Sequence, residues 1–335
     1  MIKMIEQAVK LFSLQDYDCH EIEGHEGGRN RIFICSKDGE KRFVLRVSVI
    51  GDRTEKDYLA ETEFVHYLAQ NGAPVADVIP SVNGKLVEVV EAAGDVSYSG
   101  SPTPLFISLF AYAKGMLLCD NGYRYREGAP LEEYFFNTGK TLGKIHALAK
   151  HYEPVAGHRC PDYFDKYNMV YINKLIPDTP AIYKDLKNAI SARLEDFREL
   201  PTDNQSYGLI HFDFSDGNYH IDMSTGDITV FDFDNCIYCW YMFDLANLYL
   251  HGEGWARNIS DPKERQAYMQ HYFDTILEGY KTETTIDSTL LNQLPLFIDI
   301  VLIENIVDEF ECAVREGEEV DFEDIGEAVK WIMKK

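Results

Sequence analysis

Apolar and polar residues alternate along the first third of the chain in short runs that are typical of β-strands. The runs at residues 31–35 and 42–47 are separated by a polar turn that contains glycine. One helix is expected at residues 54–70, because Asn71 and Gly72 follow it and indicate its end. The strands predicted in this part are residues 31–35, 42–47, 85–90 and 105–112.

Beyond residue 112 the apolar residues follow a helical spacing. In residues 131–149 they recur every three or four positions, which predicts an amphipathic helix. An island of short strands is expected at residues 209–232. Further helices are expected at residues 182–200, 261–281, 290–316 and 324–334. The pattern predicts an α+β protein, with strands and one helix in residues 1–112 and a mainly helical domain in residues 113–335.

The composition restricts the partners that the chain can bind. Its 56 acidic and 32 basic residues give a net charge of −24, which disfavours binding to nucleic acid and to anionic membranes. Residues 1–18 lack the pattern of a signal peptide. The longest apolar run, residues 294–303, contains Asp299 and is too short to span a bilayer. We therefore expect neither a nucleic-acid partner nor a membrane association.

The seven cysteines are scattered along the chain. Their odd number and irregular spacing favour reduced thiols in the cytoplasm over a disulfide framework. Cys236 and Cys239 have the spacing of half a zinc site, and His158 and Cys160 form another short pair, but no second cysteine pair has suitable spacing. A zinc site is therefore not expected.

The predicted strand island contains the residues with the clearest chemistry. Residues 219–221 and 228–231 can pair as a hairpin. The pairing brings Asn218, just before the first strand, beside Asp232, just after the second. An amide oxygen and a carboxylate suit Mg²⁺, which leaves other coordination positions to substrate phosphates. Asp213, on the preceding loop, is placed to accept a proton from a hydroxyl group.

This stretch matches the kinase pattern of a catalytic loop followed by a metal-binding aspartate, with the residues His211, Asp213, Asn218 and Asp232. Ser215 stands where protein kinases have a lysine. The chain therefore resembles the aminoglycoside phosphotransferase and choline kinase superfamily more closely than it resembles the protein kinases.

The resemblance implies a two-lobed protein-kinase-like fold, with an antiparallel β-sheet and one helix in the N-lobe, residues 1–112, and a mainly helical C-lobe, residues 113–335. It implies transfer of the γ-phosphoryl group of ATP, with GTP as an alternative, to a hydroxyl of a small, amine-bearing molecule, with Mg²⁺ as the cofactor. Asp213 and His211 are the implied catalytic residues. A homoserine- or choline-type kinase, a protein kinase and an inactive nucleotide-binding module stay open, and neither the acceptor nor the oligomeric state is predicted.

Three further residues bear on this resemblance. Phe212 departs from the family, which usually has glycine at this place. Asp244 is expected to cap the helix that it precedes and, by the resemblance, to steady the catalytic loop. His146 is expected to be a core histidine and not a catalytic one.

The strand at residues 42–47 and the helix at residues 54–70 carry the candidate phosphate-binding pair. Val44 and Arg46 share one face of the strand. The resemblance assigns Val44 to adenine and Arg46, in place of the usual lysine, to phosphate. Glu61 lies on the apolar stripe of the helix and needs a buried partner, for which Arg46 is the candidate. The alternatives are an exposed Arg46 and a solvated Glu61.

Two other segments resemble nucleotide-binding parts of kinases. Gly27 and Gly28 lie in a glycine-rich turn where kinases cover the phosphates, although a plain hairpin loop is an equal alternative. Residues 109–112 resemble the hinge that reads the adenine edge, with Phe110 and Tyr112 as nucleotide contacts.

An acidic helix face is the candidate acceptor site. Glu304, Asp308 and Glu311 recur at helical spacing and share one face of the last long helix. A solvated surface is the default interpretation. The alternative is that these carboxylates select a cationic acceptor through their negative potential.

Overall fold

The computed structural model describes residues 2–22, 30–48, 53–91, 104–320 and 322–334, and the chain divides into two compact units, which we call the sheet unit and the helical unit. The sheet unit comprises Met1–Tyr134, His151–Cys160 and Asp216–Asp234. The helical unit comprises Phe135–Lys150, Pro161–Ser215 and Asn235–Lys335. The lobe boundary at residue 112 stays a prediction.

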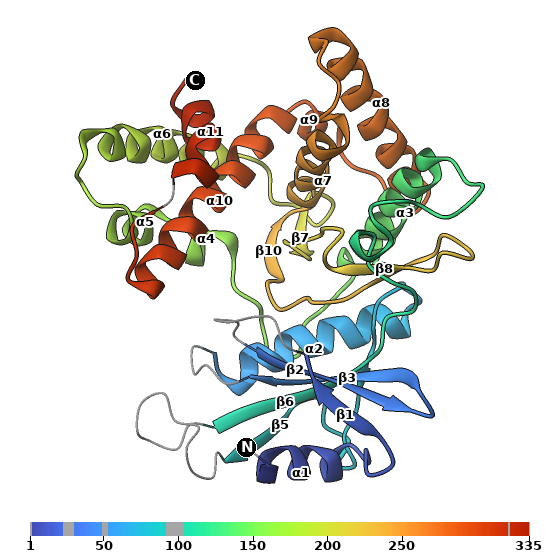
Figure 1. The fold of residues 1–335 in the computed structure, drawn as a ribbon. Helices are drawn as coiled ribbons and strands as arrows, with labels where there is room; N and C mark the ends of the chain where they lie inside the picture. Colours follow the sequence, from blue (N-terminus) through green and yellow to red (C-terminus); the bar gives the residue numbers. More distant parts are fainter. Residues whose placement is uncertain (1, 23–29, 49–52, 92–103, 321, 335) are drawn as a thin grey trace. The chain divides into compact units, whose positions relative to one another are not determined.

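The sheet unit is built on one antiparallel sheet (Figure 1). In the described residues this sheet has six strands, in the order β1-β2-β3-β6-β4, and β5 pairs with the first half of β6. The strands β2, β3 and β6 are rich in β-branched and aromatic residues, which pack well on a pleated surface. The strand bounds are β1 (Asp18–Glu21), β2 (Asn30–Lys37), β3 (Glu40–Ser48), β4 (Val78–Ile79), β5 (Glu88–Glu91) and β6 (Pro104–Ala111).

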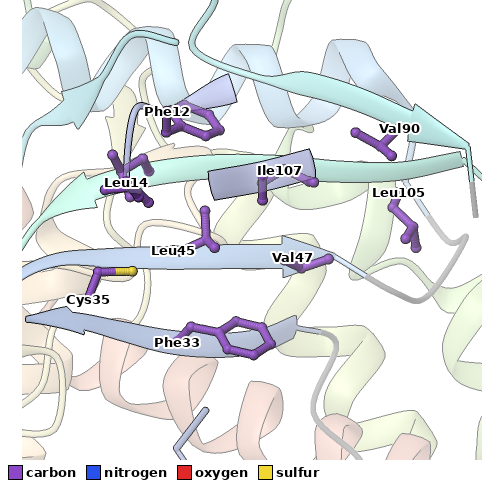
Figure 2. Close-up of a cluster of buried hydrophobic side chains, with 11 residues drawn as sticks. Phe12, Leu14, Phe33, Cys35, Leu45, Val47, Val90, Leu105 and Ile107 are labelled. Carbon is purple, nitrogen blue, oxygen red and sulfur yellow. The ribbon is translucent and has the colours of Figure 1, made fainter. Parts of the chain in front are cut away.

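One face of this sheet forms the core of the unit. Leu45 and Val47 of β3 have no exposed surface. They pack with Phe33 of β2 and with Phe12, which follows the helix α1 (Ile2–Leu11), as Figure 2 shows. The helix α1 was not predicted from the sequence. The predicted alternation along β3 is confirmed, since the side chains between these core residues face the other way.

The opposite face of the sheet carries the helix α2 (Glu55–Gln70). Tyr58 of α2 packs on the ring of Phe106 of β6, with ring centroids 4.9 Å apart. The predicted start of this helix is confirmed, because Thr54 and Asp57 form a capping box.

The predicted hairpin is present and belongs to the sheet unit. Strands β8 (Tyr219–Ile221) and β9 (Ile228–Val230) pair in antiparallel register, with Tyr219 opposite Val230. Backbone hydrogen bonds also join Val230 to Pro74 and Ala76, just after α2, at 2.9 and 2.8 Å. The hairpin is therefore held against the segment that leads from α2 back to the sheet.

The helical unit contains most of the remaining helices and a short two-stranded sheet. The helix α3 (Leu131–Ala149) has the bounds that the sequence predicts; its first turn belongs to the sheet unit. The other elements are α4 (Tyr163–Lys166), α5 (Met169–Leu175), α6 (Ala181–Arg198), β7 (Tyr207–Ile210), β10 (Ile237–Trp240), α7 (Met242–Ala256), α8 (Pro262–Lys281), α9 (Ser288–Leu291), α10 (Leu294–Glu316) and α11 (Phe322–Met333).

Two helices of the helical unit approach each other at glycines. A Cβ atom on Gly139 of α3 would lie 1.9 Å from the carbonyl oxygen of Ile276 of α8. A Cβ atom on Gly279 of α8 would lie 2.0 Å from the carbonyl oxygen of Phe136. Since real Cβ atoms do not approach so closely, only glycine permits this crossing.

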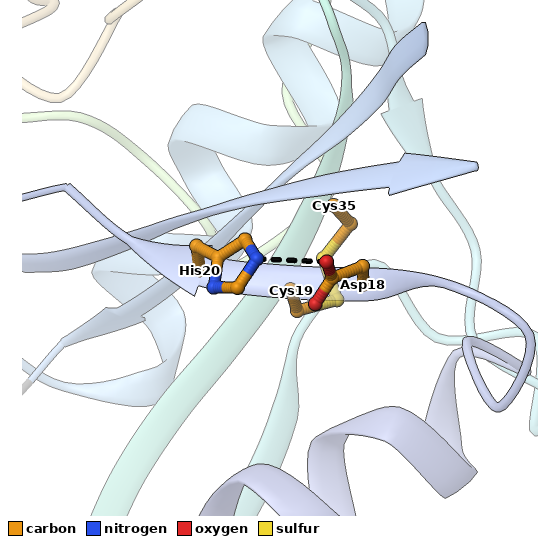
Figure 3. Close-up of a disulfide and its surroundings, with 4 residues drawn as sticks. All are labelled: Asp18, Cys19, His20 and Cys35. Atoms are coloured by element: carbon orange, nitrogen blue, oxygen red, sulfur yellow. Dashed lines mark hydrogen bonds and ion pairs between the residues drawn. A yellow bond between two sulfur atoms is a disulfide. The ribbon is translucent and has the colours of Figure 1, made fainter. Parts of the chain in front are cut away.

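The thiols differ from the expectation in one place. Cys19 of β1 and Cys35 of β2 form a disulfide, which Figure 3 shows beside the hydrogen bond between Asp18 and His20. The expectation of reduced thiols is wrong for this pair, because the register of β1 and β2 places the two cysteines directly opposite each other. No strand was predicted at residues 18–21, so the pairing of these two cysteines was not predicted either.

Cys236 and Cys239 are both buried, and burial raises the pKa of the Cys239 thiol.

Among the helices in the described part of the chain, none combines the length and the apolar character that a bilayer span requires.

Candidate active-site residues in the two units

The predicted ion pair is present in the sheet unit. The guanidinium of Arg46 on β3 donates two hydrogen bonds of 2.7 Å to the carboxylate of Glu61 on α2. The exposed fractions of the two residues are 5% and 2%. The alternatives of an exposed arginine and a solvated glutamate are therefore excluded. The fork geometry suits arginine, which explains why it can replace lysine at this place.

Further carboxylates surround the guanidinium of Arg46. Burial by itself would lower the pKa of Arg46, but the charge and hydrogen bonds of Glu61 and the charges of Asp234 and Asp232 raise it above its usual value. Asn30 of β2 donates a hydrogen bond of 3.3 Å to Asp234. A permanent positive charge thus lies among three carboxylates, which is an arrangement suited to phosphates and divalent cations.

The candidate metal ligands lie at the open end of the hairpin, as predicted. The backbone N–H of Phe231 donates to the carbonyl oxygen of Asn218 at 2.9 Å, so that Asn218 and Asp232 are adjacent across the hairpin. Asp232 has a φ of +62°, a conformation that residues other than glycine rarely adopt. Such strain is frequent at functional sites. One carboxylate and one amide oxygen are a donor set that fits Mg²⁺.

A cavity of about 500 Å³ connects these residues within the sheet unit. Its volume falls in the range of small-molecule and cofactor sites, roughly 300–1,000 Å³. Apolar side chains of β2 and β3 form one wall, and Val44 lies opposite Phe110 of β6 in the register. The predicted residues that line the cavity are Val44, Arg46, Phe110, Tyr112, Asn218 and Asp232.

The predicted hinge lies at one end of this cavity. The backbone N–H groups of Ala111 and Tyr112 donate to the carbonyl oxygens of Asp77 and Arg42, at 2.8 and 2.9 Å. These bonds fix the backbone next to the cavity. Gly27 and Gly28 lie outside the described residues.

His220 of β8 also lines the cavity, and the sequence analysis did not single it out. Its Nδ1 atom is 2.7 Å from the carbonyl oxygen of Ala113, beside the predicted hinge. Burial lowers the pKa of His220; the hydrogen bond to Ala113 opposes this effect and nearby Lys41 adds to it. The feature of the sequence that indicates His220 is its position on the predicted strand, two residues after Asn218.

Asp244 holds the predicted catalytic loop in the helical unit. The backbone N–H groups of His211 and Phe212 donate to its carboxylate, at 3.1 and 3.0 Å. His146 Nε2 is 3.1 Å from the same carboxylate, and its Nδ1 is 3.0 Å from the hydroxyl of Tyr280. Burial lowers the pKa of His146, against the effect of Asp244. The prediction of a satisfied core histidine is confirmed.

The expected helix cap at Asp244 needs a correction. Asp244 lies inside the first turn of α7, and the cap position is occupied by Tyr241. The carboxylate accepts hydrogen bonds from backbone N–H groups of the predicted catalytic loop, so that it orders this loop and not its own helix.

The conformation of Phe212 explains why the family usually has glycine there. Its φ is +73°, in the left-handed region that glycine adopts freely. The ring of Phe212 stacks on Phe243, with centroids 4.6 Å apart, and lies 5.8 Å from the ring of Tyr167. Aromatic packing therefore offsets the backbone strain.

The acidic face of α10 has partners in the helical unit. Lys166 Nζ is 3.2 Å from Asp308 and 3.5 Å from Glu311, and the hydroxyl of Tyr167 donates to Asp308 at 3.2 Å. The pKa of Glu304 is raised well above its usual value, first by burial and next by the charge of Asp308 and the hydrogen bond with it. The charge of Asp213 adds to this effect. Glu304 and the candidate base Asp213 therefore experience each other's charge.

The predicted residues thus fall into two groups. The sheet unit holds the candidate nucleotide and metal residues, and the helical unit holds His211, Asp213 and the acidic face of α10. Each group has the chemistry that the kinase pattern requires of it.

Comparison with known proteins identifies the class. The model of the phosphotransferase enzyme family matches residues 21–282, which is more than half of the chain. The chain belongs to this family of small-molecule kinases with a protein-kinase-like fold, and it is a phosphotransferase.

Relatives of this chain include kinases of small molecules. Amicoumacin kinase of Bacillus subtilis (strain 168) is 26% identical over 269 residues, which cover 80% of this chain and 74% of the relative. The solved structure of amicoumacin kinase hAmiN in complex with AMP-PNP, Ca²⁺ and Ami has a TM-score of 0.77 and 18% identity, over 99% of this chain and 93% of that chain. The microcompartment-associated aminopropanol kinase has a TM-score of 0.69 and 17% identity, over 99% and 94%. The two structures show the fold.

Proposed function

We propose that this enzyme transfers the γ-phosphoryl group of ATP to a hydroxyl of a small molecule that carries an ammonium group. The observation that carries the proposal is the cavity of the sheet unit, where the buried Arg46–Glu61 pair adjoins Asn218 and Asp232. Phosphate-binding and metal-binding groups thus share one site next to an apolar wall that fits a base.

We assign the roles of the chain's residues from this cavity and from the kinase pattern. Arg46, oriented by Glu61, binds phosphate oxygens. Asn218 and Asp232 would hold Mg²⁺, which neutralises phosphate charge and lowers the barrier to transfer. Asp213 accepts the proton of the acceptor hydroxyl while the oxygen of that hydroxyl forms a bond to the γ-phosphorus of ATP. The bond between the γ-phosphorus and the oxygen that bridges the β- and γ-phosphates breaks, and ADP leaves with the electron pair of that bond.

The acceptor class rests on the helical unit. The carboxyl of Glu304 interacts with the charge of Asp213 and with Asp308, and Tyr167 adds an aromatic face and a hydroxyl. Carboxylates beside aromatic rings favour ammonium groups. The names of the amicoumacin and aminopropanol kinases support a small-molecule acceptor, and an aminopropanol carries both an amine and a hydroxyl.

A screen of ADP release tests the acceptor. Wild-type enzyme is supplied with ATP, Mg²⁺ and one of five acceptors: an aminopropanol, choline, homoserine, an aminoglycoside or a neutral sugar. We expect an ammonium-bearing alcohol to stimulate ADP release and the neutral sugar to have no effect. Stimulation by the sugar alone would contradict the amine requirement.

Calorimetry of ATP binding tests the metal site separately. We expect Mg²⁺ to strengthen binding to wild-type enzyme by about tenfold or more, and to have little effect on Asp232→Ala. Asp120→Asn is the matched control, because Asp120 also lines the cavity but is not a candidate metal ligand. An unchanged Mg²⁺ dependence in Asp232→Ala would remove Asp232 from the metal site.

A further inference from the structure

His220 combines three properties that the proposed mechanism does not use. It lies on β8 in the wall of the cavity, its exposed fraction is only 9%, and one of its ring nitrogens has a known partner. A buried polar group needs hydrogen-bond partners. The second ring nitrogen, Nε2, is therefore available to a ligand that binds in the cavity.

The hydrogen bond to Ala113 fixes the tautomer of His220. A carbonyl oxygen can only accept, so Nδ1, at 2.7 Å from it, carries the hydrogen. In the neutral ring Nε2 then has a lone pair and is an acceptor. Within the described ranges, no protein group forms a hydrogen bond with Nε2.

The ring orientation is also fixed. His220 lies 5.4 Å from the ring of Tyr112 and 5.0 Å from the ring of Phe231, measured between centroids, and both neighbours line the same cavity. Together with the bond to Ala113, these contacts hold the ring in one place. The acceptor is therefore preorganised, which reduces the entropy lost when a ligand binds to it.

The place of His220 in the cavity indicates which part of a nucleotide it meets. The groups for phosphate and metal, Arg46 and Asp232, lie toward Glu61, whereas Tyr112 and Ala113 belong to the hinge end. Along β3 the backbone of Arg42, next to the hinge, is four residues from Arg46, or about 13 Å in an extended strand. A triphosphate at Arg46 leaves the nucleoside at the hinge end.

We propose that His220 reads the nucleoside of ATP, with Nε2 accepting a hydrogen bond from one of its donor groups. The inference rests on the proposed function, because it takes ATP as the occupant of the cavity. Donors on this nucleoside are the 6-amino group of adenine and the ribose hydroxyls. A 6-oxo purine such as guanine presents an acceptor in place of the amino group, so contact with the base would also select ATP over GTP.

Nucleotide binding without acceptor tests the inference by calorimetry. The ligands are ATP, purine riboside triphosphate, which lacks the 6-amino group, and the 2′-deoxy and 3′-deoxy forms of ATP. Wild-type enzyme should bind one of these analogues about 3- to 10-fold more weakly than ATP, the usual scale of one hydrogen bond. The analogue that shows the loss identifies the donor.

Variants show whether His220 causes the discrimination. In His220→Leu the ratio between ATP and that analogue should fall to about 1, while Phe231→Leu, a matched change in the same wall, should weaken all nucleotides alike. His220→Asn can still donate to Ala113 but removes the ring nitrogen, and we expect it to behave as His220→Leu. If His220→Asn still discriminates between ATP and that analogue, then His220 only anchors the hinge. This result would overturn the proposal.

The outcomes also separate this inference from the proposed function. If wild-type enzyme binds no nucleotide, the proposed function fails and the inference fails with it. If ATP binds but all four ligands bind equally well, or if the ratios are unchanged in His220→Leu, only the reading role of His220 is wrong.

Discussion

The charged residues of the sheet unit and those of the helical unit are held in different ways. In the sheet unit, Arg46 and Glu61 are buried, paired through two hydrogen bonds and packed between β3 and α2. In the helical unit, Asp308 and Glu311 share the single ammonium of Lys166, and the side chains of all three are about 40% exposed. The first arrangement is rigid, and the second can exchange one cation for another.

This difference agrees with the tasks proposed for the two regions. A triphosphate and its metal ion are the same in every catalytic cycle, so their binding groups benefit from fixed positions. A small-molecule acceptor differs from one kinase to another, and half-exposed carboxylates can adapt to its ammonium group with little reorganisation. The following predictions test this contrast.

The largest effect is expected for the candidate base. Asp213→Asn keeps the size of the side chain and removes the proton acceptor, so kcat should fall by about 10²–10⁴-fold while ATP affinity changes little. The control is Asp227→Asn, an exposed aspartate in the turn of the β8–β9 hairpin. Steady-state kinetics with the acceptor found in the screen provide the measurement, and near-normal turnover in Asp213→Asn would exclude the base role.

The buried ion pair should show the next largest effect, on stability. Arg46→Met or Glu61→Gln leaves one buried charge without its partner, at a cost of about 3–5 kcal/mol in the free energy of unfolding. The double variant should lose much less than the sum, because neither charge then remains. Urea denaturation of all four proteins measures this coupling.

An exposed pair serves as the control for that cycle. Lys330 and Glu327 on α11 form an ion pair of 2.6 Å on the surface of the helical unit. Its coupling should be only about 0.3–0.5 kcal/mol. Equal coupling in the two pairs, or strict additivity for Arg46 and Glu61, would contradict the contrast between a rigid and an exchangeable set of charges.

Much of the sheet-unit site can be predicted from the sequence, because it depends on local rules. Strand alternation placed Val44 and Arg46 on one face, helical spacing placed Glu61 on the buried stripe, and the hairpin brought Asn218 to Asp232. Each of these inferences needs only the periodicity of one element or the pairing of two neighbours.

The residues that the sequence analysis missed depend on contacts between distant segments. The link from Asn30 to Asp234 joins residues 204 positions apart. His220 was missed for the same reason, since its partner Ala113 lies 107 positions away. No local pattern encodes such pairs.

A pH effect of intermediate size is expected for the acceptor. The pKa of Glu304 is raised by burial and by Asp308, so the carboxyl keeps its proton above the usual pH range of glutamate. Only its ionised form attracts an ammonium group. The KM of an amine acceptor should therefore fall as the pH rises through the raised pKa, at pH values where the amine itself stays protonated.

Glu304→Gln separates this effect from other titrations. Glutamine cannot ionise, so the KM of this variant should vary less with pH and should exceed that of wild type only above the pH at which the wild-type KM falls. The KM of ATP provides the internal control, because it should follow the same pH profile in both proteins. A wild-type profile that is unchanged in Glu304→Gln would show that another group titrates.

The smallest effect is expected for Lys166, and it tests the exchangeable cation directly. Lys166 lies near Asp308 and Glu311 and over the ring of Tyr167, at 4.8 Å from its centroid, which are the groups proposed to bind the acceptor's ammonium. An ammonium tethered there competes with the one on the acceptor. Lys166→Met should therefore lower the KM of an amine acceptor by about 2- to 5-fold, the scale of an exposed ion pair. The KM of ATP should stay the same.

Lys263→Met controls for the change in net charge, because Lys263 is an exposed lysine at the start of α8. It should leave the KM of the acceptor unchanged at 0.15 M salt, where charges more than about 8 Å apart in solvent are largely screened. The advantage of Lys166→Met should shrink as salt is added, since the carboxylates that it frees are half-exposed. A higher KM in Lys166→Met would mean that Lys166 organises the acidic face for the acceptor and does not occupy it, so that this region would be as fixed as the sheet unit.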